Sequence, residues 1–203
     1  STLEGGNLDL NGGILQIDED INLNSNLLHG ADSKIVAAAG KTINYTGNEF
    51  NVGGHTLILS GGGIFANTTN LALDDPSSYL KLDGIAKVSK VSNSADMTTG
   101  KLEVAKNSII ETLLHSGSSR IDIADNKTLM LKNAFAIPSA KSMELIGAGG
   151  GTLSLANKLT LVGTLKVEAE DIIKDGTLSI NGGTLEFTKN ASIESTLVLE
   201  ASS

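Results

Sequence analysis

The sequence predicts an all-β protein in which short strands wind into one parallel β-helix, or β-solenoid, over residues 1–203. Apolar residues recur in pairs separated by one residue, the alternation typical of a strand with one buried face. Successive pairs begin six or seven residues apart, or about twice that, which leaves no space for regular helices. Gly, Asn and Asp occupy the intervals, as tight turns require. Such strands bury their apolar faces only when successive coils stack on one another.

The pattern is clearest in residues 151–200, where each turn is followed by an apolar–any–apolar triplet. The pairs in this block are Leu153/Leu155, Leu159/Leu161, Leu165/Val167, Leu178/Ile180, Leu185/Phe187 and Leu197/Leu199. Residues 167–176 could also form a short helical turn, but the neighbouring repeats favour a strand and a corner.

The N-terminal part follows the same rule, with slightly longer units in residues 33–73. Its alternating residues are Leu8/Leu10, Leu15/Ile17, Ile21/Leu23, Leu27, Ile35, Ile43/Tyr45, Phe50/Val52, Leu57/Leu59, Ile64 and Leu71/Leu73. Glycine clusters at 53–54 and 61–63 indicate corners, because glycine tolerates the positive φ angles that corners need.

The middle of the chain is less regular. Residues 92–100 are polar and predict a loop that projects from the coil stack. In residues 101–116 the spacing of the apolar residues would also suit a helix. The strand repeats on both sides favour two further strands, with Ile109 and Leu113 pointing inward. Clear alternation resumes at Ile121/Ile123 and Leu129/Leu131.

Three strand phrases occupy about 20 residues, a normal length for one solenoid repeat, so the chain predicts about ten coils. With strands about 4.8 Å apart, the rod would be about 45–50 Å long. Neither residues 1–10 nor residues 193–203 resemble a cap. We therefore expect that the native chain continues or that copies stack end to end.

Composition excludes several function classes. The net charge is −8, with 14 Lys and one Arg among the 15 basic residues, which disfavours binding to nucleic acid or to an anionic membrane. No apolar run is long enough for membrane insertion. Cysteine is absent, which excludes disulfides, thiolate metal sites and a cysteine nucleophile. A low aromatic content of 3% weakens the case for a sugar-binding cleft.

The phrases at 40–63, 125–133 and 176–190 resemble the passenger regions of bacterial autotransporters and the repeat regions of filamentous-haemagglutinin-type adhesins. The resemblance covers almost the whole chain but concerns a style of repeat. It implies a right-handed parallel β-helix at or beyond the bacterial surface, with no shared catalytic motif to carry over.

Candidate catalytic groups are few. Asp74 and Asp75 form the only adjacent aspartate pair, but a solvated turn next to Pro76 is the better interpretation than a catalytic pair. Arg120 could hold a sugar carboxylate, although a surface role is favoured. The sequence offers no nucleophile elbow and no phosphate-binding loop. We therefore assign no catalytic residue and no cofactor-binding residue.

Metal sites are similarly weak. The acidic runs Asp18–Asp20 and Glu168, Glu170 and Asp171 could bind calcium if backbone carbonyls converge on them. The histidines His29, His55 and His115 lie far apart in sequence, and only coil stacking could bring two of them together. We assign no metal ligand and no cofactor, with calcium as the one alternative kept open.

The sequence thus favours a non-enzymatic structural or adhesive protein that is extracellular or on a bacterial cell surface. Its expected partners are copies of itself or further coils of a longer chain, and a host or glycan surface ligand. The alternatives are a carbohydrate-active β-helix enzyme and a glycan-binding module. Three or more carboxylates in one groove would favour the enzyme, whereas an unbroken Leu/Ile core without a groove would favour the rod.

Overall fold

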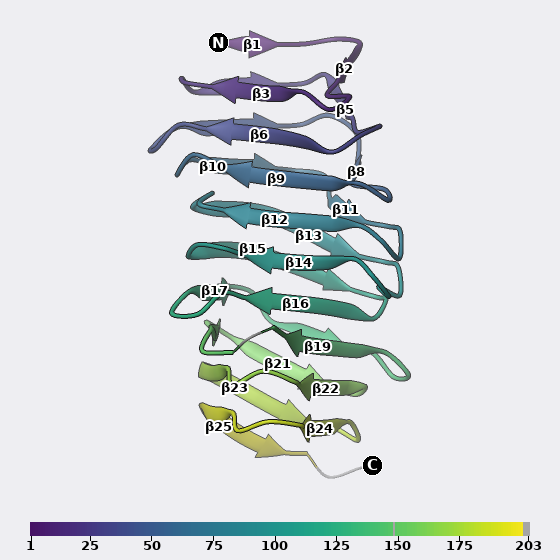
Figure 1. The fold of residues 1–203 in the computed structure, drawn as a ribbon, viewed down its shortest axis with the longest axis vertical. Helices are drawn as coiled ribbons and strands as arrows, with labels where there is room; N and C mark the ends of the chain where they lie inside the picture. Colours follow the sequence, from purple (N-terminus) through teal and green to yellow (C-terminus); the bar gives the residue numbers. More distant parts are fainter. Residues whose placement is uncertain (148, 201–203) are drawn as a thin grey trace.

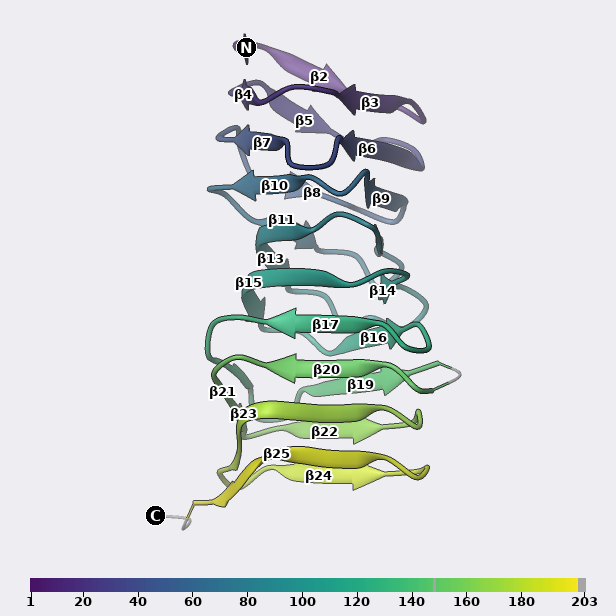
Figure 2. The ribbon, with the colours of Figure 1, turned by 90° about the vertical axis from the view of Figure 1, so that its left-hand side faces the viewer.

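The protein is an all-β solenoid in a computed structural model that describes residues 1–147 and 149–200. The coils stack along one axis with the two termini at opposite ends (Figures 1 and 2). In Figure 1 the nearer strands run to the left and the farther ones to the right while the chain descends, so the coil is right-handed. The predicted parallel β-helix is confirmed.

One side of the solenoid is a nine-stranded parallel sheet to which each coil contributes one strand, giving about nine turns. Its strands are β3 (Ile14–Ile17), β6 (Ser33–Ala37), β9 (Thr56–Ser60), β12 (Tyr79–Asp83), β14 (Lys101–Val104), β16 (Ser119–Ile123), β19 (Ser142–Ile146), β22 (Thr164–Val167) and β24 (Thr184–Phe187).

The opposite side is the main row of a 14-stranded sheet. Its strands are β1 (Thr2–Leu3), β4 (Ile21–Leu23), β7 (Thr42–Tyr45), β10 (Ile64–Asn67), β13 (Lys87–Asn93), β15 (Ser108–His115), β17 (Thr128–Leu131), β20 (Thr152–Leu155), β23 (Ile172–Ile180) and β25 (Ser192–Leu199). In-register pairing aligns like positions of successive coils, for example Ile43 with Phe65.

A third row of short strands follows the main row around a corner. It contains β2 (Asn7–Asp9), β5 (Asn26–Leu28), β8 (Phe50–Asn51), β11 (Leu71–Leu73), β18 (Phe135–Ile137), β21 (Lys158–Leu161) and the last residues of β13, β15, β23 and β25. Among the described residues, strand pairing is missing at two boundaries of this row, between β5 and β8 and between β15 and β18. We call these the β5–β8 junction and the β15–β18 junction.

The alternating residues of the sequence form one apolar core that extends through the stack. Most of the predicted pairs are buried, including Leu57/Leu59, Leu129/Leu131 and Leu165/Val167. At one end of the stack the coil has no neighbour in the structure, and Leu197 and Leu199 there are 50% and 75% exposed. The corner predicted at 61–63 is also present, and Gly61 adopts a φ of +98°.

Residues 101–116 form strands β14 and β15, as the sequence favours, but the expected inward position of Ile109 is wrong. Ile110 is fully buried instead, while Ile109 lies on the outer side. The reason is the corner within β15, where the alternation changes phase between Ile110 and Leu113. A sequence without coordinates does not reveal where a continuous strand bends.

The polar segment 92–100 is only partly a connection. Ser92 and Asn93 belong to β13, and residues 94–100 join β13 to β14 without forming a strand. Met97 of this connection is buried in the core, and its backbone nitrogen donates to the carbonyl of Ser118 at 2.9 Å. The connection is therefore anchored to the next coil. In the described residues, no helix is long and apolar enough to cross a membrane.

Candidate functional site

The outer face of the nine-stranded sheet carries a cluster of charged and aromatic side chains on three successive coils. Lys81 and Lys101 contact Glu103 at 2.9 and 3.1 Å, and Lys101 also contacts Asp122 at 2.6 Å. The Tyr79 hydroxyl donates to Glu103, and the ammonium of Lys101 lies 5.4 Å from the centre of the Tyr79 ring. Because the coils are in register, the outward residues of β12, β14 and β16 meet as neighbours.

The cluster fixes the charge of its central carboxylate. Partial burial alone would raise the pKa of Glu103, but hydrogen bonds from Tyr79, Lys81 and Lys101 outweigh it and lower this pKa to about 2. Glu103 is therefore ionised at neutral pH, when a general acid would need a proton. The arrangement is that of a rigid charged surface.

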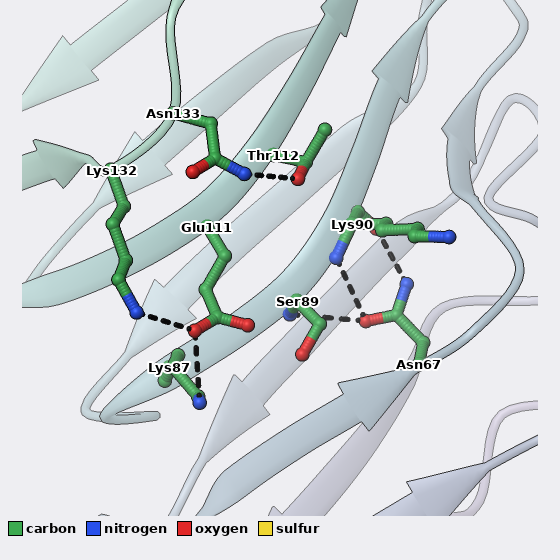
Figure 3. Close-up of polar contacts among 8 residues, drawn as sticks. All are labelled: Asn67, Lys87, Ser89, Lys90, Glu111, Thr112, Lys132 and Asn133. Atoms are coloured by element: carbon green, nitrogen blue, oxygen red, sulfur yellow. Dashed lines mark hydrogen bonds and ion pairs between the residues drawn. The ribbon is translucent and has the colours of Figure 1, made fainter. Parts of the chain in front are cut away.

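A second polar surface lies on the outer side of the main row (Figure 3). Glu111 of β15 accepts from Lys87 of β13 at 3.1 Å and from Lys132 at 3.0 Å, which joins three coils. Next to it, the Asn133 amide donates to the Thr112 hydroxyl at 2.9 Å. Each of these contacts connects a coil to its neighbour, so the outer side chains continue the backbone ladder.

Asn67 holds the corner beside this surface. Its Oδ1 accepts from the backbone nitrogens of Ser89 and Lys90, and its Nδ2 donates to the Lys90 carbonyl (Figure 3). Its Nδ2 also donates to the carbonyl of Thr69. The side chain is 2% exposed, and the four bonds satisfy its amide. This asparagine has a structural role in joining β10 to β13.

At the β5–β8 junction, side chains replace the missing strand pairing. The Tyr45 hydroxyl accepts from the backbone nitrogen of Leu27 at 3.2 Å and donates to the Asn48 carbonyl at 2.7 Å. His29 Nδ1 bonds to the Val52 carbonyl of the next coil at 2.8 Å, and its carbonyl partner makes Nδ1 the donor. Asn26 of β5 also accepts from the Asn48 nitrogen at 3.1 Å, so three side chains connect the coils across this boundary.

The β15–β18 junction is different. His115 Nε2 lies 2.7 Å from the Ser119 hydroxyl, a partner only four residues away in the chain. The bond from the Asn133 amide to the Thr112 hydroxyl crosses at the start of this boundary, and no side-chain bond crosses beyond it among the described residues. A hollow of about 410 Å³ remains instead, and its walls are Thr112, Leu113, Leu114, His115, Ser116, Ala134, Phe135, Ala136 and Pro138.

The two junctions share a sequence phrase that the pattern analysis overlooked. Leu27-Leu28-His29 and Leu113-Leu114-His115 are the same tripeptide, and a phenylalanine follows each about one coil later, Phe50 and Phe135. The repeated Leu-Leu-His tripeptide is the sequence feature that could have indicated the two junctions. Alternation within one coil does not detect it because the two copies lie four coils apart.

The sequence-based catalytic candidates do not converge. Asp75 accepts from the backbone and hydroxyl of Ser77, and these bonds lower its pKa, as in a self-contained turn. Asp74 caps the backbone nitrogen of Gly53 at 3.1 Å. Arg120 donates to the Thr98 carbonyl and lies 3.7 Å from Glu144, so its guanidinium is engaged with neighbouring coils.

The acidic runs considered for calcium are also used locally. Asp18 accepts from Gln16 at 2.6 Å, Asp20 accepts from the Thr42 nitrogen at 2.8 Å, and Glu168 pairs with Lys166. Asp171 is fully buried, and Gly151 donates to its Oδ1 at 3.0 Å; burial raises its pKa. Within residues 1–147 and 149–200, no three acidic or histidine side chains are grouped so as to hold a metal ion.

Coil stacking brings two of the three histidines together. The rings of His29 and His55 are 5.9 Å apart and nearly perpendicular, and Phe50 contacts His29 in the same way. His115 lies alone in the core, 7% exposed. The histidine pair is thus part of the aromatic packing at the β5–β8 junction.

Comparison with known proteins provides no further assignment. The chain matches no protein-family model, no curated protein and no solved structure.

Proposed function

We propose that this chain is a non-enzymatic structural or adhesive segment of an extracellular or bacterial cell-surface protein. In this role the solenoid is a stiff spacer that presents its outer faces to a host or glycan surface. The acidic, cysteine-free sequence and its resemblance to adhesin repeats support this setting.

The observation that carries the proposal is the continuity of the core. Apolar side chains from successive coils pack into one uninterrupted cluster, and parallel backbone ladders connect the coils around it. Because each coil contacts mainly its neighbours, the repeat can be extended without a new fold. A rod of this kind holds a fixed length and direction, which suits a spacer.

The outer faces support the same role. Ion pairs such as Lys101–Asp122 and Lys87–Glu111 join adjacent coils, and Lys132 extends the second pair to a third coil. Individual surface pairs contribute little, but networks across coils stiffen the stack. The faces are also flat arrays of charge on which a polysaccharide or a protein could lie.

At one end of the stack, Phe187, Leu197 and Leu199 are exposed on a coil whose outer backbone edge pairs with no further strand among residues 1–147 and 149–200. Exposed apolar edges of this kind favour association. We propose that either further coils of the same chain or a second copy cover this surface. In both cases the solenoid is one part of a longer rod.

Light scattering after gel filtration and negative-stain microscopy test this proposal over a concentration series. Linear assemblies one solenoid wide are expected, and L197E/L199E should shorten or remove them. V162E is the control, since Val162 is also exposed, at 39%, but adjoins β21, which has paired strands on both sides. Monomers at every concentration would reject self-stacking, and the mass of the protein from its native source would then decide whether more coils exist.

The enzymatic alternative has its own assay. The protein is incubated with a panel of acidic and neutral polysaccharides, and released reducing ends are measured. The proposal predicts binding without product. Turnover that D74N/D75N abolishes would overturn the non-enzymatic role while leaving the rod architecture intact.

A further inference from the structure

We propose that the β15–β18 junction is an acid-sensitive opening point of the solenoid, at which protonation of His115 separates two coils along the third row. The main row and the nine-stranded sheet keep the same coils together. The result is a local gap in the wall of the rod rather than unfolding.

The junction already lacks the connections that hold other coils together. β15 pairs with β13 along its last residues, and β18 pairs with β21, but no ladder joins β15 to β18. The last backbone bonds that cross from this coil to the next are those from Lys132 and Asn133 to Ile110 and Glu111. The Asn133 amide adds one side-chain bond to the Thr112 hydroxyl, and beyond it the boundary depends on apolar contact around the hollow.

His115 lies at this weak boundary in surroundings that would not stabilise a positive charge. It is 7% exposed, and its Nδ1 is buried without a hydrogen-bond partner of regular geometry. Nε2 reaches Ser119, which is itself 6% exposed. A protonated imidazole has two N–H donors, so at least one would be buried and unsatisfied.

No carboxylate is available to compensate the charge. The charged residues on the segments that pack against His115 are Lys87 and Lys90 on β13, Asp96 on the connection 94–100, Glu111 on β15, and Arg120 and Asp122 on β16. Asp96 is engaged with Lys141 and with the Ser118 nitrogen. Glu111 is engaged with Lys87 and Lys132, Asp122 is engaged with Lys101, and β18 carries no charged residue. Burial accordingly lowers the pKa of His115 to about 4, and a contact with its own carbonyl offsets only part of this effect.

Acid therefore favours a state in which His115 reaches water. The imidazole reaches water at the lowest free-energy cost through the adjacent hollow. Leu114, Phe135 and Ala136 in the lining of this hollow are already partly exposed. Separation there breaks no strand pairing, whereas other routes would break ladders. The opening would expose the apolar walls of the hollow.

Carbene footprinting of the full chain, read by mass spectrometry between pH 7 and pH 3.5, tests the proposal, because the reagent labels side chains that solvent reaches. Labelling of peptides covering residues 112–116 and 134–138 should rise several-fold in acid as the apolar walls of the hollow are exposed, while labelling of peptides from β9, β12 and β20 stays unchanged. The change should be absent in H115Q and present in H29Q, the matched variant at the β5–β8 junction.

Three results would overturn the proposal. These are unchanged labelling in acid, a simultaneous rise over all coils, and a local rise that persists in H115Q. If H115Q does not fold, the imidazole of the unaltered protein is titrated by NMR. A His115 that titrates near its unperturbed value, without broadening of the signals of β15 and β18, also excludes the opening.

Discussion

The two Leu-Leu-His junctions show how one local sequence leads to two different coil boundaries. At the β5–β8 junction His29 bonds to Val52 of the next coil, and Tyr45 reaches both coils through its hydroxyl. At the β15–β18 junction His115 bonds to Ser119 close to it in the chain, and a hollow remains. The first boundary is connected by side chains, and the second is open.

The difference originates in the main row rather than in the tripeptide. Tyr45 is the last inward residue of β7, and Leu131 holds the equivalent position on β17. Tyr45 is fully buried and its ring stacks on Phe65 at 5.8 Å. Leucine is shorter and has no hydroxyl, so it neither fills the corner nor satisfies the backbone there. Leucine at this position is compatible with paired third-row strands, since Leu23 and Leu155 hold it in coils where β2 pairs with β5 and β18 pairs with β21. Where that pairing is missing, the inward side chain determines whether the boundary is filled.

The largest change in the free energy of unfolding is expected when the β5–β8 junction is given the leucine that the β15–β18 junction has. Y45L should lower the free energy of unfolding by about 3–4 kcal/mol, because it leaves a cavity and unpairs the Leu27 nitrogen and the Asn48 carbonyl. Urea unfolding followed by circular dichroism measures the change. Y45F is the control that keeps the ring and should cost about 1–2 kcal/mol. Equal costs for Y45L and Y45F would show that the ring does not fill the junction.

The second prediction concerns the pH dependence of global stability at the open junction. The pKa of His115 in the folded state, about 4, lies below the ordinary value of 6.5, so between these values the unfolded state binds more protons. Stability should therefore fall by up to about 3 kcal/mol as the pH decreases from 6.5 to 4, and no further below that for this group. Urea midpoints at half-unit pH steps measure it.

H115Q should remove this slope, whereas H29Q should retain it. The comparison between the junctions would fail if H29Q, and not H115Q, flattened the curve. A slope that both variants retain would assign the effect to groups outside the two junctions.

The sequence predicted the winding well because alternation is a local property. Pairs such as Leu57/Leu59 and Leu153/Leu155 need only a periodicity of two to be placed in the core. Ile109 was misplaced because a bend inside β15 depends on the coils above and below. The junctions were missed for a related reason, since the partner of His29 is set by which residue the next coil brings beside it. In-register stacking also formed the Tyr79–Glu103 cluster, and spacing along one strand cannot reveal such neighbours.

A smaller loss of stability is expected when single hydrogen bonds at the two junctions are removed. Amide protection should then distinguish a bond that connects two coils from a bond within one coil. H29A should cost about 1–2 kcal/mol and reduce the amide protection of β8, because the Val52 carbonyl loses its donor. S119A should destabilise by a similar amount but leave the protection of β18 unchanged, since the bond between His115 and Ser119 connects no coils. Hydrogen exchange at neutral pH distinguishes them. Loss of β18 protection in S119A would mean that the boundary is held indirectly.

The smallest change in the free energy of unfolding is expected at Glu103, away from both junctions. Its pH dependence distinguishes the titration of a carboxylate from the titration of His115. Because the pKa of Glu103 is lowered to about 2, its contribution is complete above about pH 4.5 and disappears as the pH falls toward 2. E103Q should cost less than about 1 kcal/mol at pH 7, since solvent screens the surrounding ion pairs. It should flatten the stability curve only below pH 4.5 and leave the His115 slope between pH 6.5 and 4 in place. If E103Q flattened that upper range as well, the acid response would belong to the charged surface, and the open junction would no longer explain it.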